Sequence, residues 1–173
     1  MAVEIPKIRM VGDPVLHHPC RQVTAFDDDL ARLIEQMFAA LEVAEGVGLA
    51  APQVGVEQAI FVYDCPDESG QRHVGHIINP TIETRGAKVE HDEGCLSVPG
   101  PYYELERYEA ATVRGVDKTG APVEVSGTGF FARCLQHEVD HLRGVLYIDH
   151  LPRNRRRRVL RDMVPFEWNA PVP

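Results

Sequence analysis

Residues 130–142 read FFARCLQHEVDHL, and this stretch contains the motif HExxH at His137, Glu138 and His141. The spacing of its apolar residues predicts a helix that ends at Gly144. Two histidines four residues apart lie on one face of a helix, where both imidazoles can reach a single metal ion. Glu138 would leave the helix about 100° away from His137, placed to take a proton from metal-bound water. The alternative interpretation is a solvent-facing helix with two ordinary histidines.

A catalytic metal needs a third protein ligand. The pattern HExxHxxGxxH fails here because Tyr147 occupies the position of its third histidine, and a downstream glutamate occurs only in the tail. Cys134 lies on the same helix stripe as the histidines, but such a ligand set would spread over about 10 Å of helix axis, too far for bonds of about 2.0–2.3 Å. Cys95 is the better candidate, and its alternative interpretation is an ordinary buried thiol.

The rest of the chain predicts an α+β fold, in which antiparallel or mixed β-sheets pack around the helix that carries HExxH. An N-terminal helix is predicted at 27–43, where apolar residues recur at steps of three and four. A C-terminal helix is predicted from about 152 to 163, and an extended tail at 164–173. The predicted strands are 59–63, 74–78 (closed by Asn79-Pro80), 110–116 and 122–125, with a hairpin turn at 117–120. We expect residues 1–173 to form a single catalytic domain.

Composition is typical of a globular protein, with 44% hydrophobic and 25% charged residues. No apolar run is long enough for a membrane span, and the N-terminus lacks the pattern of a signal peptide. The four cysteines form no CxxC pair, so we expect reduced thiols and a cytoplasmic location. A net charge of −8 argues against general nucleic-acid binding, although the arginine-rich segment 153–161 forms a basic patch.

Three motifs follow one another along the chain, at 46–53 (GVGLAAPQ), 93–97 (EGCLS) and 136–141 (QHEVDH). Together they resemble the three signature motifs of the peptide deformylases, in the same order and at similar separations. The pieces 12–16 (GDPVL) and 79–80 (NP) also match, so the resemblance extends over nearly the whole chain. It implies an enzyme that removes the formyl group from N-formylmethionine at the start of nascent bacterial proteins.

The resemblance also implies a role for each matching residue. The implied metal ligands are Cys95, His137 and His141. Fe²⁺ is the expected ion, with Zn²⁺, Ni²⁺ or Co²⁺ as alternatives, and water or hydroxide would fill the fourth position. The hydroxide would attack the formyl carbon while Glu138 acts as general base and then as general acid. The Gln53 side-chain amide and the Leu96 backbone N–H would stabilise the oxyanion.

Substrate recognition is implied in the same way. The residues that would shape the methionine side-chain pocket are Val47, Gly48, Phe130 and Cys134. His91 and Arg133 stand where relatives often have an apolar pocket residue, and Tyr102 replaces an arginine that some relatives use near the downstream end of the peptide. These departures predict a changed pocket and a lost peptide contact. We also expect Arg107 to pair with Glu93 and to steady the metal-binding loop.

Two other classes of function stay open. One is a non-catalytic metal-bound module that docks on the ribosome, and the other is a peptidase that uses the same HExxH chemistry. An inactive descendant would be expected to lose Glu138, Gln53 or a ligand, and a peptidase would need a different third ligand. The segment 153–161 is interpreted either as a solvated helix face or as a surface for ribosomal RNA. The expected partners are therefore N-formylmethionyl peptides and, through this helix, the ribosome, with no membrane partner.

Overall fold

A computed structural model describes residues 3–164 of the chain. The helices are α1 (Asp28–Val43), α2 (Gly129–Leu142) and α3 (Arg153–Asp162). The strands are β1 (Gly48–Ala50), β2 (Ile60–Pro66), β3 (Arg72–Cys95), β4 (Val98–Val116) and β5 (Pro122–Thr128). Short 3-10 helices cover Pro14–Leu16, Ala51–Val54 and Tyr147–His150. Apart from Val164, the tail predicted at 164–173 lies outside the described residues.

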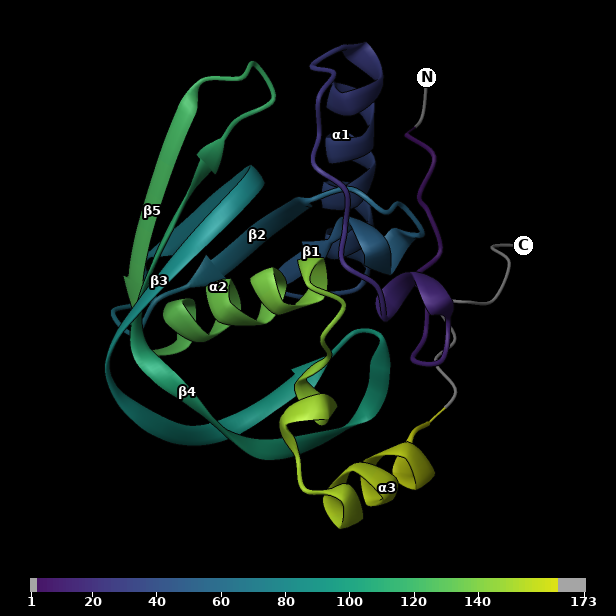
Figure 1. Cartoon of the computed structure of the whole chain (residues 1–173), viewed down its shortest axis with the longest axis vertical. Helices are drawn as coiled ribbons and strands as arrows, with labels where there is room; N and C mark the ends of the chain where they lie inside the picture. The colour runs from purple at the N-terminus through teal and green to yellow at the C-terminus, as the bar shows by residue number, and fades with distance from the viewer. Residues whose placement is uncertain (1–2, 165–173) are drawn as a thin grey trace.

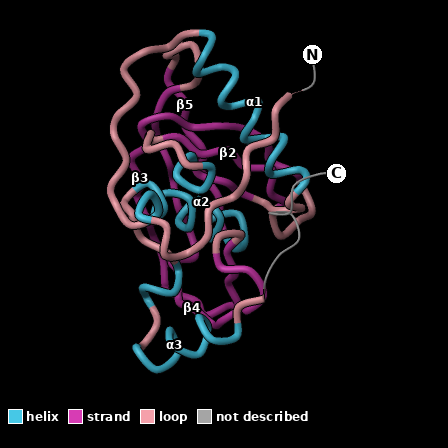
Figure 2. The backbone as a smooth tube through the Cα atoms, turned by 90° about the vertical axis from the view of Figure 1, so that its right-hand side faces the viewer, coloured by secondary structure: helices cyan, strands magenta, loops and turns pink. Residues whose placement is uncertain are grey.

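The five strands form one sheet in the order β1-β2-β3-β4-β5, and each neighbouring pair is antiparallel. With 24 and 19 residues, β3 and β4 are several times longer than an ordinary strand. Figure 1 shows both strands curving past α2, so that the sheet lies on more than one side of this helix. In Figure 2, α3 lies at the end of the molecule farthest from α1. The predicted α+β fold is confirmed, with one continuous sheet, and α2 carries the HExxH sequence.

Asn79 and Pro80 do not end the second predicted strand. Asn79 adopts a φ of 52°, and the register between β3 and β4 shifts at this point. Such an irregularity accommodates a proline, which cannot donate a ladder hydrogen bond. The Asn79 side chain also exchanges two hydrogen bonds with the backbone of Val23, at 2.8 and 2.9 Å. The strand therefore continues to Cys95, and the prediction of 74–78 is too short.

Hydrophobic clusters on the sheet hold α1 and α2 in place. The side chains that α1 buries are Leu30, Ile34, Met37, Ala40 and Leu41. The side chains of α2 that form a second cluster with β2 and β4 include Phe131, Leu135, Val139 and Leu142. Each large apolar side chain that is fully buried stabilises the fold by about 1.5–3 kcal/mol. The Asp27 side chain caps α1 by accepting a hydrogen bond from the backbone of Leu30 at 3.0 Å, in agreement with the helix predicted at 27–43.

The arginine-rich helix α3 is attached through its one apolar face. Val159 is fully buried in a cluster with Leu146 and Leu151. Arg156 is half-buried and pairs with Asp149 at 3.4 Å, whereas the other arginines of the helix are exposed. Consecutive residues on a helix point in different directions, so one of a run of arginines must approach the protein. No helix among residues 3–164 has the length and apolar character needed to cross a membrane.

Candidate metal centre

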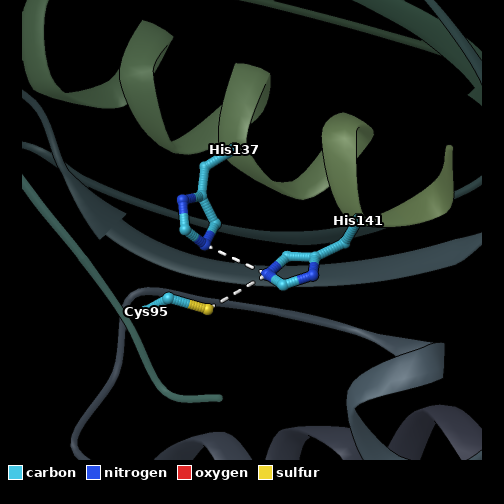
Figure 3. Close-up of side chains that lie close together, drawn as sticks. All are labelled: Cys95, His137 and His141. Carbon is cyan, nitrogen blue, oxygen red and sulfur yellow. Dashed lines mark hydrogen bonds between the residues drawn. The ribbon is translucent and has the colours of Figure 1, made fainter. Parts of the chain in front are cut away.

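Three metal-ligating side chains converge between α2 and the end of β3. The ligand atoms of Cys95, His137 and His141 all lie within 4.8 Å of one another. The Cys95 Sγ atom is 3.3 Å from His141 Nε2, which is 3.1 Å from His137 Nε2. Figure 3 shows both imidazoles projecting from α2 toward the thiol. Within the described part of the chain, no second group of three histidine, cysteine or acidic side chains converges in this way.

The three donors fit a divalent transition metal. Tetrahedral bonds of about 2.0–2.3 Å place the donor atoms about 3.3–3.7 Å apart, close to the 3.3 Å between Cys95 and His141 and the 3.1 Å between the two imidazoles. One thiol and two imidazoles leave a fourth position open, which is the pattern of catalytic rather than structural sites. Cys134 does not join the group, because its thiol is buried and lies 3.6 Å from the carbonyl oxygen of Val47. The sequence-based rejection of Cys134 as a ligand is thus supported by its position.

Glu93 orients His137 and is itself held by Arg107. Its Oε1 lies 2.7 Å from His137 Nδ1, so Nδ1 can donate to the carboxylate while Nε2 faces the metal position. Arg107 donates to Oε1 at 2.7 Å and to Oε2 at 3.0 Å, which confirms the predicted pair. Burial raises the pKa of Glu93, but the bonds to His137 and Arg107 outweigh burial and hold it well below its usual range. Arg107 also binds Asp140, so two carboxylates share this guanidinium.

The Glu138 carboxyl lies beside the ligand cluster in a nearly dry position, with 3% of the residue exposed. Its Oε2 has no hydrogen-bond partner among residues 3–164. Burial raises the pKa of Glu138 to about 7, with His137 opposing the shift and Glu93 adding to it. A buried carboxyl with one unpartnered oxygen can exchange a proton with a small molecule in the adjoining cavity.

Gln53 is fixed at both ends of its side-chain amide. Its Oε1 accepts a hydrogen bond from the Ala50 backbone at 2.9 Å, and its Nε2 donates to Ser97 Oγ at 3.1 Å. Nε2 also lies 3.7 Å from the Cys95 sulfur, so an amide N–H of Gln53 faces the ligand cluster. Leu96 follows Cys95 directly and lines the same cavity. The sequence did not single out the buried Ser97, and its place in the motif EGCLS was the only available signal.

The ligand cluster opens into a cavity of about 420 Å³. All four residues predicted for the side-chain pocket line it, namely Val47, Gly48, Phe130 and Cys134. Cys134 is 6% exposed and lies deep, whereas Phe130 is 45% exposed and lies near the surface. The cavity is also lined by Gln53, Cys95, Leu96, His137 and Glu138, so the proposed substrate pocket and the reactive groups share one space.

The three positions that the resemblance marked as departures differ in what they contact. His91 is exposed and lies outside the lining of the cavity, so it does not shape the pocket. Arg133 does line the cavity, but its guanidinium turns away to bind the carbonyls of β3 and β4. Tyr102 is 72% exposed, and its ring covers Gly94 so closely that a Cβ there would be 2.6 Å from a ring carbon. Of His91 and Arg133, which were both expected to change the pocket wall, only Arg133 lines the cavity.

The fold and this site define a metal-dependent hydrolase whose HExxH helix is completed by a cysteine from a neighbouring strand. Comparison with known proteins narrows that class. Residues 5–157 match the family model described as polypeptide deformylase. Peptide deformylase 2 of Streptomyces avermitilis is 52% identical over 170 residues, which cover 96% of this chain and 91% of the relative. The peptide deformylase of Acidothermus cellulolyticus is 44% identical and covers 93% of this chain and 87% of its own.

Solved structures agree with the sequence comparison. A peptide deformylase from Legionella pneumophila superposes with a TM-score of 0.85 at 41% identity, covering 92% of this chain and 93% of that one. A peptide deformylase from Ehrlichia chaffeensis in complex with actinonin gives a TM-score of 0.85 at 34% identity, with 91% and 95% covered. The chain belongs to the polypeptide deformylase family, and it is a peptide deformylase.

Proposed function

We propose that this enzyme removes the formyl group from the N-terminal formylmethionine of nascent proteins and releases formate. The observation that carries the proposal is the buried Glu138 carboxyl, whose Oε2 is unpartnered within residues 3–164 and which lies beside three ligands with an open fourth position. A non-catalytic docking module needs neither feature. A peptidase of the HExxH type would use a third ligand other than Cys95, so the cysteine favours the deformylase.

Cys95, His137 and His141 would hold one divalent ion, with Fe²⁺ as the proposed native metal and Zn²⁺, Ni²⁺ or Co²⁺ as substitutes. Such an ion supplies Lewis acidity and lowers the pKa of water in the fourth position. The protein's contribution is the position of the donors. Glu93 fixes the ring of His137 through Nδ1, and the short Cys95 side chain is presented by the irregular end of β3, where the register with β4 shifts.

Glu138 would act as the general base and then as the general acid. Its carboxylate takes a proton from the attacking water and later passes that proton to the departing amine of the methionine. The position of Glu138 supports both steps, because it lines the cavity next to His137 and its environment is almost free of bulk water. A carboxylate that is poorly solvated is a stronger base than one in water, which favours proton uptake.

Gln53 and Leu96 would stabilise the charge that develops on the formyl oxygen. The Gln53 amide is locked by Ala50 and Ser97 before substrate arrives, so it does not have to reorient during the reaction. The Leu96 backbone N–H would be the second donor. The methionine side chain would enter the part of the cavity between Val47, Gly48, Phe130 and Cys134, where apolar walls suit a thioether.

The exposed arginines of α3 support a second proposed partner, the ribosome. They form a basic surface on a chain whose net charge is −8, and the buried Val159 anchors the helix to the rest of the protein. Contacts of this kind with RNA phosphates weaken steeply as salt rises. We place the enzyme in the bacterial cytoplasm, where nascent chains emerge, and its similarity to bacterial proteins supports that location.

The decisive measurement is formate release from formyl-Met-Ala-Ser by protein purified without oxygen. The wild type is compared with Glu138→Ala and with Glu106→Ala, an exposed glutamate on β4, after the metal content of all three is matched. Formate from the wild type and the Glu106 variant, but not from metal-loaded Glu138→Ala, is the expected result. No formate from fully loaded wild type would contradict the proposal and favour a docking module.

A further inference from the structure

Arg133 is a buried arginine inside the HExxH helix, one turn before His137. Only 7% of its side chain is exposed, although it lies on the face of α2 that carries the metal ligands. Burial of a guanidinium costs several kcal/mol unless its N–H groups are hydrogen-bonded and its charge is paired. The hydrogen bonds and charged partners of Arg133 must therefore offset the cost of burying its guanidinium.

The Arg133 guanidinium joins α2 to both long strands. Nη1 donates to the carbonyl oxygen of Val89 at 3.0 Å, and Nη2 donates to that of His91 at 3.0 Å. Nη2 also reaches the carbonyl oxygen of Leu105 on β4, at 2.7 Å. The first two acceptors lie on β3, in the part of that strand just before Cys95. One side chain thus ties the segment that delivers the cysteine ligand to the helix that delivers the histidines.

Arg133 also contacts the carboxylate that orients His137. Its Nη2 lies 3.4 Å from Glu93 Oε2, whereas the His137 ring binds Oε1 of the same carboxylate. Arg107 donates to both oxygens of this carboxylate. Two guanidinium groups therefore contact Glu93 Oε2, while Oε1 is held by His137 and Arg107, so these contacts restrict rotation of the carboxylate. Burial lowers the pKa of Arg133, Glu93 opposes that shift, and the nearby Arg107 adds to it, as expected for two cations that share one anion.

We propose that Arg133 is a positioning residue of the metal centre, which fixes Glu93 and the β3 segment before Cys95 relative to the histidines of α2. This role rests on the metal site proposed above. Arg133 touches no reacting atom, and it acts through Glu93 and the strand backbone. Residues that support metal ligands in this way typically change metal affinity by about 10- to 100-fold when removed.

The test uses Co²⁺ as the probe and the full-length chain. Arg133→Met removes the hydrogen-bonding fork but keeps an unbranched side chain, and Arg133→Lys keeps the charge without the planar fork. Arg157→Met, at an exposed arginine of α3, is the matched control. For each protein, the stoichiometry of Co²⁺, its visible absorption bands and its rate of transfer to a chelator are measured, with circular dichroism to verify the fold. These readouts do not depend on turnover of a formylated peptide.

We expect the wild type and the Arg157 variant to bind one equivalent with the same bands and the same dissociation rate. Arg133→Met should lose Co²⁺ about 10-fold faster or more, with shifted bands, and Arg133→Lys should fall between Met and the wild type. If folded Arg133→Met showed the wild-type absorption bands and lost Co²⁺ at a rate within twofold of the wild type, the inference would be overturned. If that variant does not fold, Arg133→Lys decides by the same criterion. Failure of the wild type itself to bind Co²⁺ would overturn the metal site and, with it, the role of Arg133.

Discussion

The carboxyl group of Glu138 rests directly on Gly48, so closely that a Cβ at Gly48 would lie 2.4 Å from Glu138 Oε1 and 2.8 Å from its carboxyl carbon. Gly48 begins β1, and Glu138 lies on α2. The motif at 46–53 therefore contacts the proposed catalytic glutamate of the motif at 136–141. The lack of a side chain at Gly48 is what allows the carboxyl group to occupy this position.

Gly48→Ala should therefore damage catalysis more than it damages the fold. The methyl group meets the end of a flexible side chain, so Glu138 moves rather than the backbone. We expect kcat for formyl-Met-Ala-Ser to fall by about 10- to 100-fold, because a shift of about 1 Å in a reacting group costs that much. The melting temperature should change little. A kcat within twofold of the wild type would show that the contact does not fix the carboxyl.

The raised pKa of Glu138 predicts a pH-dependent stability of the metal-free protein. The pKa is about 7 in the folded state and near 4.5 in a free side chain. Between these values only the folded state holds the proton, so the stabilisation present at low pH is lost as the pH rises through 7. Glu138→Gln stays neutral throughout. Its free energy of unfolding relative to the wild type should therefore increase by about 2–3 kcal/mol between pH 5 and pH 8.

Chemical denaturation of both metal-free proteins at the two pH values measures this difference directly, because other titrating groups contribute equally to the pair. A difference between the variant and the wild type that does not change with pH would mean that the Glu138 carboxyl is hydrated in the folded protein.

Arg107 should be essential for both stability and metal retention. Its removal leaves Glu93 and Asp140 buried without their shared cation, and losing one partner of a buried charge pair costs about 3–5 kcal/mol. Arg114→Ala is the control, because that arginine is 52% exposed and its pairs should contribute less than about 1 kcal/mol. Urea denaturation and metal analysis test both variants. Unchanged metal retention and activity in Arg107→Ala would contradict a role for the pair in the metal-binding loop.

The sequence was sufficient for the helices and, together with the family resemblance, for most of the residues that meet in the site. In α1 and α2 the apolar residues repeat with the helical period, and this pattern is local. His137 and His141 are neighbours in the chain, so their shared face follows from one element. The span of the helix argued against Cys134, but the role of Cys95 as third ligand was assigned only through the resemblance, because nothing local places the end of β3 beside α2.

The length of β3 and β4 could not be predicted in the same way. Residues 86–92 of β3 are all exposed, so no alternation of apolar and polar side chains marks them as a strand. Gly86, with a φ of 83°, and Asn79 look like turn residues but lie at irregular positions within one strand. The contacts of Arg133 could not be predicted either, because its acceptors are carbonyl groups more than 25 residues away in the sequence. Backbone acceptors carry no sequence signature.

The assignment of Cys95 as the sulfur ligand predicts a contrast with Cys20. Cys20 is half-buried, and burial together with Glu57 raises the pKa of its thiol to about 11, so it does not supply a thiolate near neutral pH. Cys95→Ser keeps the shape of the side chain but removes the soft donor. We expect this variant to bind Co²⁺ at least about 100-fold more weakly and to release no formate, whereas Cys20→Ser retains both properties.

Equilibrium titration with Co²⁺, monitored at the sulfur-to-metal charge-transfer band near the ultraviolet, distinguishes the two variants. If that band persisted in Cys95→Ser and disappeared in another cysteine variant, a different cysteine would be the sulfur ligand. The proposed role of Arg133 in positioning the β3 segment before Cys95 would then be contradicted as well.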